Sequence, residues 1–415
     1  MGMSTALWLQ EKGFNVTVFD GSAPGAGTSY GNACTIADYA CVPVNNPDII
    51  FNLPKLLFSN NSPLSIDPWY GLTHLPWLIQ FLKNCLPNQV SHITQALGAI
   101  LLHANDGLDP LIQRTDSSHL FRQLGCLYVY ETKERFDAAQ KSNQSRIDNG
   151  VIFEQVDALE IHDLEPNLNV PFQNGLFFPN ARQVVNPKHL IDRYFETFIQ
   201  HQGHYQNQFV THIQEDSNRA DHDKKINIML ANGATECVDK VVVCCGAFSN
   251  QIPGSGTERL PLDTERGYHI QFADHASLIT RPVGWAEAGL YATPTNEGLR
   301  LAGTVEIAGT NESKNPKQIN YLKRRAKQLF DLTQPTSDWL GYRPTFPDAL
   351  PVIGPSPASN RILLAFGHQH IGLTLAGITG KLIAEIAAGE SPSHDITPFS
   401  PNRFQKKSGT TVPLF

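Results

Sequence analysis

The sequence lacks the features that define several large protein classes. None of its apolar runs is long enough to span a bilayer, and no basic segment followed by an apolar one predicts a signal peptide. Lys and Arg number 32 against 39 Asp and Glu, and the net charge of -7 argues against a general nucleic-acid-binding protein. A hydrophobic content of 41% in 415 residues predicts an ordered globular protein with enough core for two or three domains.

Recognisable cysteine and metal motifs are also absent. The seven cysteines form no C-x-x-C pair and are odd in number, which favours a reducing compartment. Cys244 and Cys245 follow a run of three valines, where two small residues of a buried strand are a better interpretation than a redox pair. The 15 histidines show no H-E-x-x-H or comparable spacing, so the sequence predicts no metal site.

The chain begins with half of a dinucleotide-binding pattern. Residues 3–10 have a helical pattern, and residues 16–19 form an apolar run that predicts a buried parallel strand. Asp20 ends that run, where an acidic residue accepts hydrogen bonds from a ribose. The first strand and the first two glycines of G-x-G-x-x-G are missing, and Gly2 fits the third. We therefore expect a truncated N-terminus and a reduced phosphate cradle.

Further along, helical and strand patterns alternate. The loop 21–36, rich in Gly and small hydroxyl residues, is either a phosphate-contacting loop or an ordinary surface loop. Residues 89–115 are expected to form one long helix, and 316–333 another. Between 210 and 303 several short strands follow one another. This mixture predicts an α/β protein with two intertwined domains.

Four stretches resemble one family in both content and order. They are the glycine-rich segment 27–33, the strand-to-glycine segment 241–249, the strands within 266–306, and the segment 341–375, which opens with Gly341-Tyr342-Arg343-Pro344-Thr345. The chain resembles the FAD-dependent D-amino-acid oxidase superfamily, and within it the bacterial D-amino-acid dehydrogenase (small subunit) branch. Two departures stand out: Phe248 where Trp is usual, and Gln369 where relatives often have Gly.

The resemblance implies a Rossmann-like FAD-binding domain interleaved with an antiparallel-sheet substrate domain. The FAD-binding domain would comprise residues 1–60, 151–250 and 341–400. The substrate domain would comprise residues 61–150 and 251–340.

The resemblance also implies the contacts of FAD. Asp20 would hold the ribose, and a helix starting near Gly372 would direct its N-terminal N–H groups at flavin N1 and C2=O, which become anionic on reduction. The implied cofactor-binding residues are Gly2, Asp20, Thr28, Ser29, Asn32, Val210, Gly246, Gly372, Leu373 and Thr374.

On the substrate side, the resemblance implies oxidation of a D-amino acid. The α-carbon would pass a hydride to flavin N5, and the imine would hydrolyse to a 2-oxo acid and ammonia. Arg343 would bind the substrate carboxylate through two parallel hydrogen bonds, unless it is a structural or surface arginine. Tyr268 would line the pocket or belong to the core, and His368 would contact flavin or substrate or only cap a turn. Arg266 is a candidate ion-pair residue.

Two alternatives stay open. The substrate could be another secondary or cyclic amino acid, sarcosine-like or hydroxyproline-like, or the chain could be a truncated, catalytically silent relative. The resemblance implies a cytoplasmic protein at the inner face of the membrane, with a quinone as electron acceptor. The aromatic and apolar residues of 47–85 could supply a peripheral membrane contact, although a place in the core is the better interpretation. No nucleic-acid partner is expected.

Overall fold

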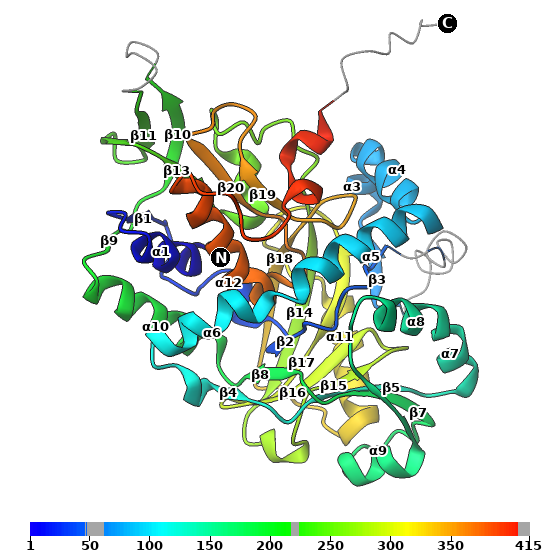
Figure 1. Cartoon of the computed structure of the whole chain (residues 1–415). Coiled ribbons are helices and arrows are strands. Elements are labelled where there is room, and N and C mark those ends of the chain that lie inside the picture. The colour runs from blue at the N-terminus through cyan, green and yellow to red at the C-terminus, as the bar shows by residue number, and fades with distance from the viewer. Residues whose placement is uncertain (46, 48–61, 217–223, 406–415) are drawn as a thin grey trace, which may run out of the picture.

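A computed structural model describes residues 1–45, 47, 62–216 and 224–405 (Figure 1). Helices and sheets alternate along the chain, which confirms the expected mixed α/β class. Within the described ranges, no helix combines the length and the apolar character needed to cross a membrane.

The largest sheet has nine strands and is mainly antiparallel. Its order is β18-β14-β17-β16-β15-β5-β7-β6, and β3 pairs in parallel with β17. The bounds are β3 Leu64–Ile66, β5 Cys126–Tyr130, β6 Glu154–Asp157, β7 Asn174–Phe178, β14 Asp263–Phe272, β15 Val283–Trp285, β16 Leu290–Thr295, β17 Gly298–Ile307 and β18 Ser337–Thr345.

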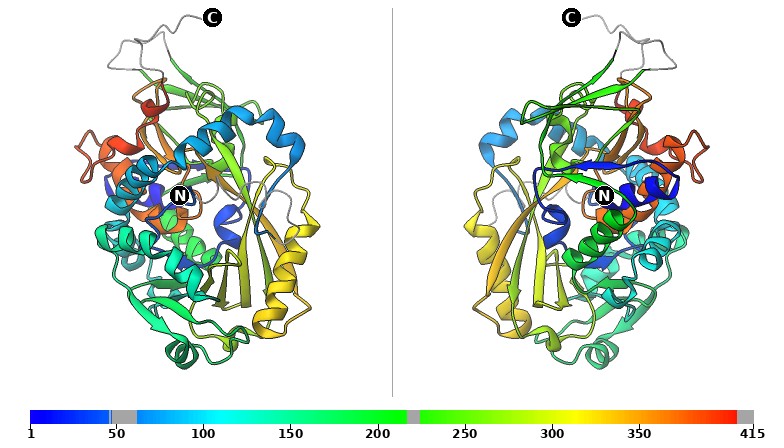
Figure 2. Two further views of the ribbon diagram at one scale, coloured as in Figure 1. Left: turned by 90° about the vertical axis from the view of Figure 1, so that its right-hand side faces the viewer. Right: turned by 90° about the vertical axis from the view of Figure 1, so that its left-hand side faces the viewer.

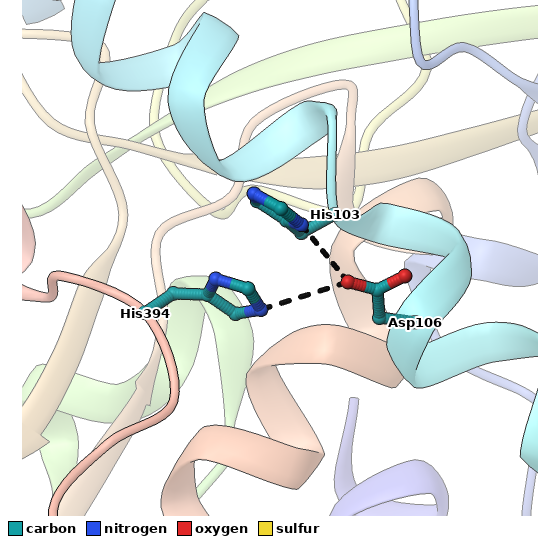
Figure 3. A group of neighbouring side chains, drawn as sticks. All are labelled: His103, Asp106 and His394. Atoms are coloured by element: carbon teal, nitrogen blue, oxygen red, sulfur yellow. Dashed lines mark hydrogen bonds and ion pairs between the residues drawn. The ribbon is translucent and has the colours of Figure 1, made fainter.

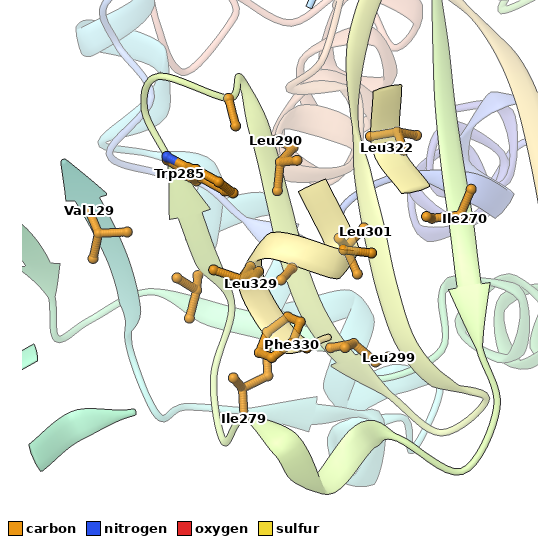
Figure 4. Packing of buried hydrophobic residues seen from close by; sticks show 14 of the residues in the cluster. Val129, Ile270, Ile279, Trp285, Leu290, Leu299, Leu301, Leu322, Leu329 and Phe330 are labelled. Atoms are coloured by element: carbon orange, nitrogen blue, oxygen red, sulfur yellow. The ribbon is translucent and has the colours of Figure 1, made fainter. Parts of the chain in front are cut away.

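One helix, α11 (Pro316–Phe330), covers one face of this sheet. Asn315 caps its N-terminus, and Pro316 supplies the fixed φ of the first turn. Its apolar side packs Leu322 and Leu329 against strand residues such as Leu301 (Figure 4). Figure 2 shows α11, in yellow, on the side of the sheet away from most other helices. Because β14 is buried along its whole length, its opposite face must be covered as well.

The other half of the molecule is built around α12 (Gly372–Ala387), which is buried along most of its length. It packs between α1 (Gly2–Glu11) and α6 (Ala104–Arg114) (Figure 1). Glycines permit this close approach: an added Cβ at Gly377 would lie 2.5 Å from the backbone of Gly107. The sequence pattern predicted one helix over 89–115, but the structure has two, α5 (Pro87–Leu101) and α6, which meet at Leu102 and His103.

The described residues also form four smaller sheets and several further helices. β1 pairs in parallel with β9, and β13 pairs in parallel with β20 in the sheet β13-β20-β19. The strands of these sheets are β1 Thr17–Phe19, β2 Thr35–Ile36, β4 Phe121–Arg122, β8 Arg182–Val184, β9 His204–Gln206, β10 Val210–Glu215, β11 Ile226–Leu230, β12 Thr235–Val238, β13 Val241–Val243, β19 Val352–Pro355 and β20 Ile362–Phe366. The further helices are α3 Pro68–Thr73, α4 Leu75–Asn84, α7 Lys133–Ala138, α8 Gln140–Asp148, α9 Ala158–Leu164 and α10 Pro187–Gln200.

The expected two-domain division stays a proposal, and hydrogen bonding distributes some segments differently. β6 and β7, from the segment assigned to the FAD-binding domain, pair within the nine-stranded sheet. Helices α5 and α6, from the segment assigned to the substrate domain, pack with α12. The boundary at residue 151 therefore does not follow the sheets.

The aromatic segment 47–85 is described in part, since residues 48–61 lie outside the described ranges. Trp77 of α4 is buried, and its Nε1 donates to the carbonyl of Pro261 at 3.0 Å, as a core residue would. Trp69 of α3 is 76% exposed. The segment thus divides between core and surface, and a membrane contact stays a prediction.

Candidate active site

The face of β14 and β18 opposite α11 packs against η1, the short helix Thr28–Gly31. Trp339 lies so close to Gly31 that an added Cβ there would be 2.1 Å from its indole ring. The Nδ1 of His269 donates to the carbonyl of Gly31 at 2.9 Å, and the His269 ring stacks on Trp339. Thr28 Oγ1 donates to the carbonyl of Tyr342 at 2.8 Å. The loop that carries Thr28 is therefore in direct contact with β18, the strand that carries Arg343.

Arg343 lies on this face, over a glycine that makes room for it. In the antiparallel register Gly267 pairs with Gly341 and Glu265 with Arg343, so side chains at these positions share one face. An added Cβ at Gly267 would lie 2.3 Å from Nη2 of Arg343 and 2.4 Å from its Cζ. The guanidinium thus occupies the space that a side chain at residue 267 would fill.

A strained bulge in β17 helps to orient the guanidinium. Nη1 of Arg343 donates to the carbonyl of Thr304 at 2.8 Å. Thr304 has φ +60°, a conformation that β-branched residues rarely adopt, and it lies where the β14–β17 register shifts. Its Oγ1 is buried and finds no hydrogen-bond partner among the described residues. Strain of this kind persists where the surrounding structure holds it, and it is frequent at functional sites.

Glu265 is a charged residue of this face that the sequence pattern did not reveal. It is buried and lies opposite Arg343. Burial raises the pKa of Glu265 to about 7, although the Arg343 guanidinium opposes that shift. His370, whose side chain is exposed, also lies within electrostatic reach of Arg343. The carboxyl of Glu265 can therefore change its charge near neutral pH directly beside Arg343.

A buried arginine on β17 fixes the loop that follows η1. Nη1 of Arg300 donates to the carbonyls of Tyr30 at 3.0 Å and Asn32 at 3.2 Å. Nε of Arg300 donates to Gln271 Oε1 at 3.0 Å. Cys34, next in the loop, has φ +61°. Arg300 was not among the predicted site residues, because nothing in its local pattern marks a contact with a segment 270 residues away.

The structure does not bring Tyr268 together with Arg343. Tyr268 alternates to the other face of β14, where it joins the core under α11. Its hydroxyl donates to Glu306 and accepts from the backbone N–H of Asn315 at 3.2 Å. Arg266 shares that face and forms a buried ion pair with Glu306 at 3.4 Å.

His368 and Gln369 lie between β20 and α12. The Nε2 of His368 is 3.0 Å from Thr379 Oγ1, and burial lowers the pKa of His368 to about 3, so its ring is neutral at pH 7. Gln369 has φ +48°, a left-handed conformation that suits glycine, the residue that the resemblance implies at this position. Its backbone N–H donates to the carbonyl of Pro344 at 3.0 Å, and its Nε2 is buried without a partner in the described part of the chain.

The N-terminus of α12 lies beside the η1 loop. The first N–H groups of a helix have no hydrogen-bond partner within that helix. In α12 no described side chain caps them either. Thr374 Oγ1 accepts from the backbone N–H of Ala37 at 2.9 Å. Ser29 and Leu373 line a common cavity of about 10 Å³, room for roughly one water molecule. Gly372 begins the helix against His368.

The remaining predicted residues are distributed over strand ends, a helix start and a loop. Asp20 directly follows β1, its side chain is exposed, and its Oδ1 accepts from the N–H of Ser22 at 2.9 Å. Gly246 follows β13 with φ +57°, and nothing lies within 4 Å of an added Cβ. Gly2 opens α1 against Cys244, and Val210 opens β10. The side-chain Oδ1 of Asn32 accepts from the backbone N–H of Cys34 at 2.8 Å, so the Asn32 side chain helps to order this loop.

Two comparisons with known proteins match nearly the whole chain. A family model described as FAD dependent oxidoreductase (DAO) matches residues 1–386. The D-amino-acid oxidase of Bradyrhizobium diazoefficiens is 30% identical over 413 residues, which cover 97% of this chain and 96% of that protein.

Solved structures share the fold at lower sequence identity. Glycine oxidase from Geobacillus kaustophilus is 20% identical, with a TM-score of 0.70 over 98% of this chain and 96% of that one. L-Proline dehydrogenase from P. horikoshii is 16% identical, with a TM-score of 0.68 over 97% and 95%.

Proposed function

The chain belongs to the family of FAD-dependent oxidoreductases, and from that membership we propose that it oxidises D-amino acids to 2-oxo acids and ammonia. The observation that carries the proposal is the position of the Arg343 side chain. Its guanidinium lies over Gly267, on the face of the sheet that packs against η1. The 30% identity to a D-amino-acid oxidase supports the D-configured substrate.

The residues present fit FAD. Asp20 offers an exposed carboxylate at the end of a parallel strand, where a ribose hydroxyl would donate to it. Gly246 leaves open space beside its backbone, and α12 presents uncapped N–H groups to an anionic group. Thr304 Oγ1 and Gln369 Nε2, both buried without partners among the described residues, are polar atoms that a ligand could satisfy. When bound, FAD supplies the hydride acceptor for the substrate α-carbon.

The chain's own contribution is to bind and orient the substrate. Arg343 would hold the carboxylate through two parallel N–H···O bonds, and this fixes the plane of the substrate as well as its position. Its remaining Nη1 bond to Thr304 keeps the guanidinium from rotating. His368 is neutral and hydrogen-bonded to Thr379 of α12. It would hold the chain in place before the first turn of α12 rather than exchange protons with the substrate.

Tyr268 has a positioning role at most, because it lies on the far face. Glu265 sets the charge around Arg343. We propose a quinone as electron acceptor, at the inner face of the membrane, as the resemblance implies.

Anaerobic reduction of the flavin tests the proposal. The full chain, supplied with FAD, is mixed with D-alanine, L-alanine, glycine, sarcosine and proline of both configurations, and bleaching of the flavin absorbance is followed. We expect D-alanine to bleach the flavin and L-alanine not to. Preferential bleaching by sarcosine, glycine or proline would replace the proposal with a secondary or cyclic amino-acid substrate. Bleaching by none of them, with FAD bound, would favour a catalytically silent relative.

The electron acceptor is tested with the same protein in air. Reduction of a quinone analogue without hydrogen peroxide would support a dehydrogenase. Steady peroxide production at the rate of substrate loss would overturn the quinone and identify an oxidase.

A further inference from the structure

Three potential metal ligands meet at a point outside the candidate active site. His103 lies at the junction of α5 and α6, Asp106 in the first turn of α6, and His394 in the segment after α12 (Figure 3). Nδ1 of His103 is 2.9 Å from Asp106 Oδ2, and Nε2 of His394 is 3.7 Å from the same oxygen. Figure 3 shows both imidazoles directed at this one carboxylate.

The distances suit a tetrahedral metal centre. Ligands at the usual zinc distances of about 2.0–2.2 Å lie roughly 3.3 Å apart in a tetrahedron. The two measured distances to Asp106, 2.9 and 3.7 Å, bracket that value. All three ligand atoms lie within 4.8 Å of one another, and the imidazole rings are stacked with centroids 3.9 Å apart. Small side-chain rotations would bring the two nitrogens into coordinating positions.

The site is accessible to an ion from solvent. The His103 and Asp106 side chains are 43% and 52% exposed, so an ion can enter and keep water in a fourth position. Lys381, the nearby cation, is engaged with Ser393 at 2.9 Å and Glu385 at 3.3 Å.

We propose that His103, Asp106 and His394 form a binding site for a divalent transition-metal ion of the zinc class. Two imidazole nitrogens and one carboxylate oxygen are typical ligands of Zn²⁺, and Co²⁺ accepts the same set. The bound ion would join the first turn of α6 to the segment that follows α12. Its role is structural, since no residue of the candidate active site belongs to it.

This site was out of reach of the sequence pattern. His394 lies almost 300 residues beyond the other two ligands, and His103 acquires its position only because the helix expected over 89–115 breaks at that residue. Motifs with regular ligand spacing, on which the prediction of no metal site rested, do not cover such an arrangement.

The test is metal uptake by the untagged full chain after treatment with a chelator. We expect the wild-type protein to bind one Co²⁺ with the visible absorption of a tetrahedral centre, and Zn²⁺ to displace it. His394→Ala and Asp106→Asn should weaken this binding by about tenfold or more, because losing a ligand costs at least what losing a supporting residue costs. His92→Ala, which removes an exposed histidine of α5, is the matched control and should bind as the wild type does.

Two further readouts separate metal binding from misfolding. Zn²⁺ should raise the Tm of the wild type and of His92→Ala but not of Asp106→Asn. In the wild type alone, Zn²⁺ should protect His103 and His394, but not His92, from acylation by diethylpyrocarbonate. Equal uptake and affinity in wild type and variants, or no protection of the two histidines, would overturn the proposal.

Discussion

Gly267→Ala should disable substrate binding without disturbing the fold. The added methyl would lie 2.3 Å from Nη2 and 2.4 Å from Cζ of Arg343, much closer than an ordinary contact of 3.4 Å or more. The clashing atoms belong to the end of a flexible side chain, so the backbone of β14 can stay in place. The guanidinium must move, and its bond to the Thr304 carbonyl must lengthen or break.

The magnitude follows from the displacement. Arg343 must move by about 1 Å to reach an ordinary contact distance, and a misplacement of about that size costs roughly 100-fold in rate. This corresponds to about 2.8 kcal/mol in kcat/KM. Stability should change little, since Ala is no worse than Gly in the interior of a strand.

The assay is anaerobic flavin reduction, measured for the wild type, the two single variants Gly267→Ala and Arg343→Ala, and the double variant. Because Gly267 acts through Arg343, the double variant should be as slow as Arg343→Ala alone, within about twofold. Gly71→Ala, whose methyl lies 3.1 Å from Ile66 and does not touch Arg343, is the matched control. An equal loss from Gly267→Ala in the presence and absence of Arg343, or no loss at all, would refute this account of the site.

Arg343→Lys should recover only part of the activity lost in Arg343→Ala, because an ammonium cannot form two parallel bonds to a carboxylate; the KM for amino acids, measured in steady state, should stay raised by about tenfold or more. Equal KM values for Lys and Arg would contradict bidentate binding. Asp20→Ala should weaken FAD affinity, measured by fluorescence titration, more than it lowers kcat at saturating FAD, because the carboxylate would contact a ribose remote from the reacting atoms. Unchanged FAD affinity would remove Asp20 from the cofactor site.

Much of the fold was predictable because local rules determine it. The helix expected over 316–333 is present as α11, Pro316–Phe330, and the strand expected before Asp20 is present as β1. The break between α5 and α6 falls at Leu102 and His103, inside the segment 89–115 whose pattern predicts one helix, so that pattern did not reveal it. The pairing of β6 and β7 within the large sheet was not predictable either, because strand partners lie far along the chain.

The site was predictable only as far as its motifs extend. Arg343 was expected from its motif, and the structure places it beside the loop of Thr28, Ser29 and Asn32. Tyr268 was expected in the pocket or the core, and strand alternation in the register with β18 decided for the core. The identities of Gly267 and Thr304 carried no signal of their own. Their roles arise from a cross-strand register and a bulge, which a single sequence does not specify.

The carboxyl of Glu265 is expected to make substrate binding at Arg343 depend on pH. Burial raises the pKa of Glu265 to about 7, so the folded protein holds this proton between the usual carboxyl value and pH 7, whereas the unfolded chain does not. Its contribution to stability is therefore greatest at low pH and is lost as the pH rises towards 7. Below pH 7 Glu265 is neutral and leaves Arg343 free for the substrate carboxylate. Above it, the ionised Glu265 competes for the guanidinium.

We therefore expect the KM for amino acids to rise by about tenfold, or 1.4 kcal/mol, between pH 6 and pH 8 in the wild type. Glu265→Gln keeps the shape of the side chain but cannot ionise, so its KM should stay at the low value across that range. The unfolding free energy of Glu265→Gln, from urea titrations at the same pH values, should not show the decrease with rising pH that is expected for the wild type. Because both quantities depend on one proton, a pH-dependent KM that persists in Glu265→Gln would assign the titration to another group, such as the amino group of the substrate.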